Sequence, residues 1–176
     1  MSQVDDELYR CHLKRCESCL EISGCAQELE RFKTLLATPA SVFDFNAILP
    51  YPDTYKKLDK EHDQWTALSE AERKTAMMPD TSSGANWRMV HWGTPWVWNA
   101  QLSTSNGALC YTFITGYTPP IALLLKASTA FPGLQFFLFC ELIEHDLTGE
   151  YVIQSGRVSS EEWMPMESDC QVDSGE

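Results

Sequence analysis

The chain has 176 residues, of which 44% are hydrophobic and 22% are charged. This length and composition predict one globular domain with its own core and exclude a large multidomain protein. No apolar run reaches the roughly 20 residues that a bilayer-spanning helix needs. The polar, acidic start MSQVDDELYR does not resemble a signal peptide. We therefore expect a cytoplasmic protein without a membrane partner.

The charge is strongly negative and unevenly distributed. The formal net charge is −12, and no Lys or Arg follows Arg157. Residues 158–176 are therefore predicted to form an acidic, flexible tail, which holds Glu161, Glu162, Glu167, Asp169, Asp173 and Glu176. An acidic protein repels nucleic-acid phosphates and suits basic partner surfaces. The alternative is a charge that only keeps the protein in solution.

Seven cysteines without a secretion signal argue against a disulfide scaffold. Cys11, His12, Cys16, Cys19 and Cys25 raise the question of zinc, since Cys16-x-x-Cys19 has a familiar ligand spacing. An extended strand would place Cys16 and Cys19 on opposite faces, and no second ligand pair follows at finger spacing. We expect reduced thiols, with Cys16 facing the core, and neither a metal nor another cofactor.

The first half of the chain begins with a polar extension, residues 1–15, which lacks clear periodicity. Alternation predicts a strand at Cys16–Ile22, and helical spacing of apolar residues predicts a helix at Ala26–Leu36. Val42–Leu49 is again strand-like, and prolines end it. These features indicate a strand and a helix, followed by a strand-like stretch before the insert.

An insert at about residues 53–86 follows. Charges of both signs alternate in Asp53–His62, which suits a solvated helix or loop. Ser69-Glu-Ala-Glu72 is a capping-box pattern and predicts a short helix. Asp80–Asn86 is polar, contains glycine and is predicted to be a surface loop.

The second half is richer in apolar residues. An Asn106-Gly107 pair predicts a hairpin turn between two strands. Thr118-Pro-Pro120 predicts the start of a helix, because proline fits the first turn. The predicted elements are the strands Thr94–Gln101 and Ala108–Thr115, the helix Ile121–Ala130, and the strands Leu134–Leu142 and Glu150–Gln154.

Taken in order, these elements predict an α+β fold. Strand–helix–strand–strand–helix–strand is the order of a ferredoxin-like βαββαβ sandwich, with helices on one face of the sheet. We expect a single domain over residues 16–157, with the helical insert described above and an extra C-terminal strand.

A run of tryptophans, Trp87-Arg-Met-Val-His-Trp-Gly-Thr-Pro-Trp96, is the most distinctive motif of the chain. It has four ordered companions, namely Cys16–Gly24, Asp44–Pro52, Tyr117–Pro120 and Phe131–Phe136. Together the five segments resemble the YubB ferredoxin-like family, small proteins carried by phages and plasmids, over roughly residues 16–155. The resemblance implies a ferredoxin-like domain and a mobile genetic element, and it implies no established activity.

Three polar positions of the family pattern are replaced. His91 stands where the pattern has Asn, Pro95 where it has Lys, and Val97 where an acidic residue is usual. If those positions carried a shared chemistry, this chain has lost it. The tryptophans are then better explained as scaffold than as a reactive site.

Two interpretations of the tryptophan run remain open. Indole rings can form a stacking platform or anchor a partner, or they can close one end of the core. Strand alternation places Trp96 and Trp98 on one face and Val97 on the other. Burial decides between the two interpretations.

Catalytic motifs are not found: the chain has no G-x-S-x-G, no P-loop and no H-E-x-x-H. The polar cluster Glu141, Glu144, His145 and Asp146 is as well explained by a solvated turn. We therefore expect no enzyme and no catalytic residue.

The predicted strands carry the aromatic residues Tyr111, Phe113, Phe137 and Phe139, as an RNA-binding sheet would. Few basic residues accompany them, and an acidic body works against phosphate binding. Direct nucleic-acid binding is therefore disfavoured.

The resulting hypothesis is a mobile-element accessory protein that binds and inhibits a host protein, such as a nucleic-acid-handling defence complex. An acidic surface can occupy a basic nucleic-acid groove, so DNA mimicry is a testable mechanism for an anti-CRISPR or anti-restriction inhibitor. The alternatives are a nucleic-acid-binding regulator that uses the sheet and a small metalloprotein. The candidate partner-binding residues are Trp87, Arg88, Trp92, Trp98, Asp59, Glu61, Asp63, Glu161 and Glu162.

Overall fold

The computed structural model describes residues 15–166 and shows an α+β fold built on a six-stranded antiparallel open sheet. The strands are β1 (Arg15–Ser23), β2 (Val97–Ser105), β3 (Ala108–Gly116), β4 (Gln135–Leu142), β5 (Leu147–Gln154) and β6 (Arg157–Pro165). Their order across the sheet is β2-β3-β1-β4-β5-β6, and each neighbouring pair is antiparallel. Residues 1–14 of the extension predicted at residues 1–15 lie outside the described residues, as do residues 167–176, and Arg15 is the first residue of β1.

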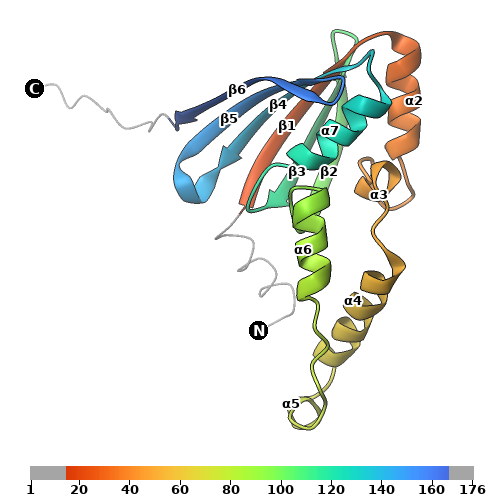
Figure 1. Ribbon diagram of the computed structural model, residues 1–176, viewed down its shortest axis with the longest axis vertical. Helices are drawn as coiled ribbons and strands as arrows, with labels where there is room; N and C mark the ends of the chain where they lie inside the picture. Colours follow the sequence, from red (N-terminus) through yellow and green to blue (C-terminus); the bar gives the residue numbers. More distant parts are fainter. Residues whose placement is uncertain (1–14, 167–176) are drawn as a thin grey trace, which may run out of the picture.

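The helices divide into two groups. They are α2 (Ala26–Leu36), α3 (Phe45–Ile48), α4 (Asp53–Thr66), α5 (Glu70–Arg73), α6 (Ser82–His91) and α7 (Ile121–Ala130), with a 3-10 turn at Ile143–His145. In Figure 1, α2 and α7 lie against one face of the sheet, whereas α4 and α5 project away from it. We call residues 53–80, which contain α4 and α5, the helical arm.

The core lies between the sheet and the helices on its covered face. Leu20 of β1 pairs with Tyr111 of β3 and Leu138 of β4, and all three side chains are fully buried. Phe32 of α2 packs edge-on against Phe136 of β4, with ring centroids 5.4 Å apart. Burial of such large apolar side chains is the main stabilising contribution.

The other face of the sheet, here called the open face, is not covered by any helix or strand of residues 15–166. Side chains alternate across each strand, so the neighbours of the core residues point this way. Cys19 and Glu21 of β1 are exposed, as is Phe137 of β4. The open face is therefore available as a surface.

Two predicted helices and the hairpin are confirmed. The helix α7 begins at Ile121, directly after Pro119 and Pro120, and buries Leu123 and Leu124. The predicted bounds of α2 are those observed. Asn106 and Gly107 have φ values of 50° and 81°, the left-handed pair that a tight hairpin turn requires.

The strand predicted at Val42–Leu49 is wrong, because this segment forms a loop and the short helix α3. The Asp44 carboxylate accepts a hydrogen bond from the Asn46 backbone N–H at 2.9 Å and caps the helix. Phe43 and Phe45 are both buried, which gives the sequence its strand-like alternation.

The loop predicted at Asp80–Asn86 is also wrong beyond its first residues, since α6 begins at Ser82. Gly84 is buried because the Tyr51 hydroxyl lies directly against it, where an added Cβ would collide. Gly84 thus allows Tyr51 to approach the α6 backbone closely. Polar composition and a glycine together imitate a loop in the sequence.

Residues 158–165, assigned above to a flexible tail, form the edge strand β6 instead. Every residue of β6 is exposed, and Glu162 lies directly opposite Glu150 of β5. Charged residues are common on edge strands because they discourage pairing with other chains. Glu161 and Glu162 therefore lie on an ordered edge strand.

Within the described residues, none of the helices combines the length and the apolar composition that crossing a membrane requires.

Candidate functional site

Trp92 closes one end of the core. Its side chain is 6% exposed, and its indole N–H donates to the Leu49 carbonyl at 3.0 Å. Its ring packs edge-on against Phe45 and Trp87, with centroids 5.6 Å and 5.8 Å apart. Trp92 thus joins α3 to α6, as the scaffold interpretation predicts.

Arg88 and Asp59 tie the helical arm to α6. The Arg88 Nη1 lies 2.9 Å from the Asp59 Oδ2, and the two side chains are only 21% and 29% exposed. The guanidinium also sits over the Tyr51 ring, 4.7 Å from its centroid. Burial raises the pKa of Tyr51 to about 12, although the Arg88 charge acts in the opposite direction. Arg88 and Asp59 therefore already have partners inside the protein.

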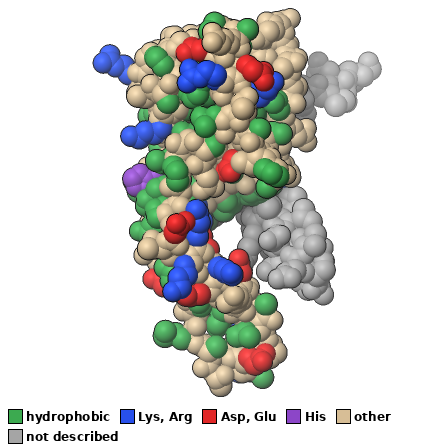
Figure 2. All heavy atoms as spheres, turned by 90° about the vertical axis from the view of Figure 1, so that its right-hand side faces the viewer, with side chains coloured by type: hydrophobic (Ala, Val, Ile, Leu, Met, Phe, Trp, Pro, Cys, Tyr) green, Lys and Arg blue, Asp and Glu red, His purple; other side chains and the backbone are tan. Residues whose placement is uncertain are grey.

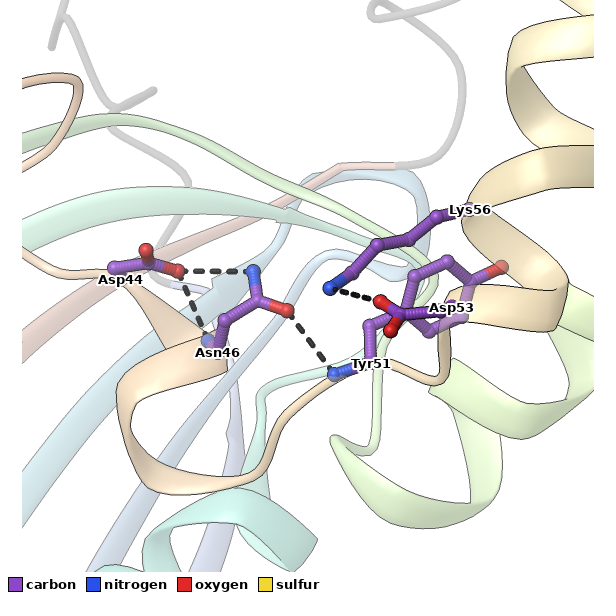
Figure 3. A network of polar contacts seen from close by, with 5 residues as sticks. All are labelled: Asp44, Asn46, Tyr51, Asp53 and Lys56. Carbon is purple, nitrogen blue, oxygen red and sulfur yellow. Dashed lines mark hydrogen bonds and ion pairs between the residues drawn. The ribbon is translucent and has the colours of Figure 1, made fainter.

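A short polar network holds the turn before the arm (Figure 3). Asp44 accepts from the Asn46 side-chain amide at 3.0 Å, and the Asn46 carbonyl oxygen accepts from the Tyr51 backbone N–H at 3.1 Å. Asp53 and Lys56 form an ion pair at 3.0 Å at the start of α4. The Asp44–Pro52 motif therefore encodes a turn that positions Tyr51 beneath Arg88.

The Gly93–Trp98 part of the run fixes the start of β2. The Thr94 hydroxyl is buried and donates to the Gly116 and Trp96 carbonyls at 2.8 Å and 3.1 Å. Trp96 covers Gly116 and packs against Trp98 with the two rings tilted, their centroids 3.8 Å apart. The prediction that these two indoles share a face is confirmed. Because Thr94 and Trp96 make these turn contacts, β2 starts at Val97 and not at Thr94.

The three altered positions have different surroundings. His91 is exposed and lies beside Trp87, with ring centroids 4.5 Å apart. Pro95 is buried, and Val97 is half-buried opposite Thr115. Of the three, only His91 carries a polar side chain.

The helical arm carries balanced charge. Seven acidic and five basic residues lie between Asp53 and Asp80, and Figure 2 shows the two signs interspersed on this part of the molecule. Of the predicted contact residues, Glu61 and Asp63 are exposed on α4, with Glu61 3.9 Å from Lys57. The arm is therefore not a strongly acidic surface.

The acidic surface lies on the open face instead. Its carboxylates come from four strands and are Glu17, Glu21, Glu141, Glu150 and Glu162. Two pairs stand directly opposite each other across neighbouring strands, Glu17 with Glu141 and Glu150 with Glu162. On the six described strands, the bases are Arg15 and Arg157, each at the first position of its strand.

Apolar side chains lie among these carboxylates. Phe137 is 38% exposed and Phe139 is half-buried, and Phe139 pairs with Cys19 on one side and Glu150 on the other. A hollow of about 390 Å³ lies next to Phe139 and is bordered by Glu17 and Glu141. The open face thus combines an aromatic patch with negative charge.

Glu161 and Glu162, adjacent in the sequence, lie on different faces. The Glu161 carboxylate accepts from the Tyr151 hydroxyl at 3.2 Å and the Trp163 indole N–H at 3.0 Å. Glu162 has its cross-strand neighbour Glu150 on the open face. Glu161 is therefore a structural acceptor, and Glu162 belongs to the acidic surface.

The cysteine geometry agrees with the predicted strand. Cys16 is buried and Cys19 exposed, on opposite faces of β1. A hydrogen bond between the Cys16 and Cys140 thiols lowers the pKa of Cys16 and raises that of Cys140. Cys11 and His12 lie outside the described residues. Within residues 15–166, no three Cys, His, Asp or Glu side chains are grouped to hold a metal.

The structure also shows where two other predicted features lie, namely the strand aromatic residues and the polar cluster after β4. Of the aromatic residues considered for RNA binding, Tyr111 and Phe113 are buried in the core, which leaves only Phe137 and Phe139 on the open face. Of the polar cluster Glu141, Glu144, His145 and Asp146, the last three are exposed in the turn after β4, where Asp146 has a φ of 49°, whereas Glu141 belongs to β4.

Comparisons with known proteins add a similarity of fold. No protein-family model matches the chain, and no curated protein matches it. The crystal structure of the protein api92 from Yersinia pseudotuberculosis, described with the family model DUF1281, superposes with a TM-score of 0.54 at 9% sequence identity. The match covers 85% of this chain and 97% of that one. At this identity the similarity concerns the fold alone.

Proposed function

We propose that this protein is a non-enzymatic accessory protein of a phage or plasmid that binds a host protein and inhibits it. The open face is the binding surface. Its partner is a basic surface on a nucleic-acid-handling protein in the host cytoplasm. The carboxylates take the place of nucleic-acid phosphates, so the protein acts as a DNA mimic against a defence system.

One observation carries this proposal: two pairs of glutamates face each other on the open face, Glu17 with Glu141 and Glu150 with Glu162. Like charges in directly opposite positions destabilise a sheet. Neutral polar residues would serve the fold better, so the charges favour a role outside folding. A surface rich in Lys and Arg, such as a nucleic-acid groove, would relieve the repulsion.

The membership of the YubB ferredoxin-like family is part of the proposal. In its support, the order β2-β3-β1-β4, with α2 and α7 in the two connections, is the order that a βαββαβ arrangement predicts. The strands β5 and β6 then extend this sheet on the β4 side and enlarge the open face.

The test compares two doubly neutralised variants in a pull-down from bacterial lysate. Glu141→Gln/Glu150→Gln removes two charges from the open face, and Glu61→Gln/Asp63→Asn removes two from the helical arm. We expect the wild type and the arm variant to retain the same nucleic-acid-binding protein, and the open-face variant to lose it. Duplex DNA and high salt should displace that protein.

Equal recovery of partners by both variants would contradict the proposal. So would direct binding of the isolated protein to DNA or RNA that weakens steeply with salt, since that result supports a nucleic-acid-binding regulator.

A further inference from the structure

We infer that the hollow beside Phe139 is a socket for an arginine side chain of the partner. This inference rests on the proposed function, because it specifies what the open face recognises. The hollow of about 390 Å³ lies between β1, β2, β3 and β4, and the residues used below are Glu17, Asn99, Gln101, Ile114, Phe139 and Glu141.

The two carboxylates at the hollow differ in their pairing. Glu17 Oε1 lies 3.1 Å from the Arg15 Nη2, so an arginine of this chain already engages one side of the site. Glu141 stands directly opposite Glu17 and has no ion pair within residues 15–166. A cation that enters the hollow therefore finds one open carboxylate and a second that is partly satisfied.

The apolar walls suit a flat cation with an aliphatic stem. The Phe139 ring and Ile114 line the same hollow as the carboxylates. A guanidinium can stack on an aromatic face, and the methylene groups of arginine can cover aliphatic surface. The hollow thus offers a contact to each part of an arginine side chain.

The strand β2 contributes amides at the rim. Its pairing with β3 is irregular between Trp98 and Gln101, and Asn99 has a φ of 54°. Such bulges redirect side chains, and here both Asn99 and Gln101 line the hollow.

This set of groups selects arginine over lysine. Arginine presents five N–H donors in a plane, which suits the two neighbouring carboxylates Glu17 and Glu141 on the adjacent strands β1 and β4. The lysine ammonium is compact and strongly hydrated, so it gains less from the Phe139 ring. Both residues respond equally to the overall negative charge, and only the socket distinguishes them.

The experiment measures the affinity of the full chain for two labelled nine-residue peptides by fluorescence anisotropy. The peptides alternate glycine with arginine or with lysine and carry the same charge. We expect the arginine peptide to bind about two- to fivefold more tightly, which is the range of an exposed cation–π contact. Phe139→Leu should abolish that preference and leave the lysine peptide unchanged, whereas Phe137→Leu, outside the hollow, should preserve it.

The failures are distinguishable. Equal affinity for both peptides overturns the socket and leaves the acidic binding face intact. Binding of neither peptide at low salt overturns the socket and also counts against the proposed function. Retention of the preference in Phe139→Leu, with an unfolding curve like the wild type, assigns the selectivity elsewhere and refutes the socket.

Discussion

Replacing Glu150 with Gln should stabilise the protein, because it removes one charge of a like-charged pair. Glu150 and Glu162 are directly opposite, so their carboxylates are about 6 Å apart. Two unit charges at that distance repel by about 0.7 kcal/mol in water. Screening leaves about 0.6 kcal/mol at 0.01 M salt and about 0.1 kcal/mol at 1 M. The low-salt value corresponds to a rise in Tm of about 2 °C for a chain of this size.

Urea denaturation at the two salt concentrations measures this change, and Glu162→Gln with the double variant completes a mutant cycle. Glu161→Gln is the matched control, since it removes an equal charge from β6, the strand that carries Glu162. It should not stabilise the protein, because the Glu161 carboxylate accepts two hydrogen bonds. A Glu150→Gln variant that is no more stable than the wild type at 0.01 M salt would refute the reasoning, as would a gain that persists at 1 M.

Three further predictions concern the scaffold. Gly116→Ala should lower the free energy of unfolding by about 1–3 kcal/mol, because the new Cβ would lie 2.5 Å from the Trp96 ring; an unchanged denaturation midpoint would contradict this packing. Thr94→Val should cost about 0.5–1.5 kcal/mol by removing the buried hydroxyl that donates to the Gly116 and Trp96 carbonyls, each of which keeps a backbone N–H donor; an unchanged free energy of unfolding would contradict that role. Burial raises the pKa of Tyr51 from 10 to about 12, so its contribution to stability is complete below pH 10 and falls as the pH rises to about 12. The phenolate absorbance that the Tyr51→Phe variant lacks should develop near pH 12 in the wild type. If that absorbance develops near pH 10 instead, this assignment is contradicted.

The sequence predicts most of the regular elements of residues 15–166. Periodicity locates α2 and α7 because both bury one apolar stripe, and Asn106-Gly107 defines the hairpin. Prediction fails where tertiary contacts override local patterns. Phe43 and Phe45 are both core residues of a loop and a capped turn, and their spacing imitates a strand.

The edge strand β6 is hidden in the sequence because its acidic composition resembles that of a flexible tail. Ser155 and Gly156 have φ values of 50° and 75°, and a Ser-Gly pair is a recognised turn signal. That signal joins β5 to β6 as a hairpin. Because β6 pairs with β5, Glu162 lies beside Glu150 on the acidic surface of the open face and not in a tail.

The candidate site is only partly visible in the sequence. In the tryptophan run, the structure places Trp92 and Arg88 in contacts within the protein, as a scaffold role predicts. The acidic face is assembled from four strands that are distant in sequence. Glu17 and Glu141 meet only through the pairing of β1 with β4, which no local pattern reveals.

The most direct measurement is a map of backbone amide chemical shifts for the full chain titrated with the arginine peptide. A binding surface on the open face predicts that the shifts concentrate around Cys19, Thr112 and Phe139, on the adjacent strands β1, β3 and β4. Shifts that concentrate instead on α4 or on Trp87–Trp92 would contradict that surface and would return the binding role to the arm or the tryptophan run.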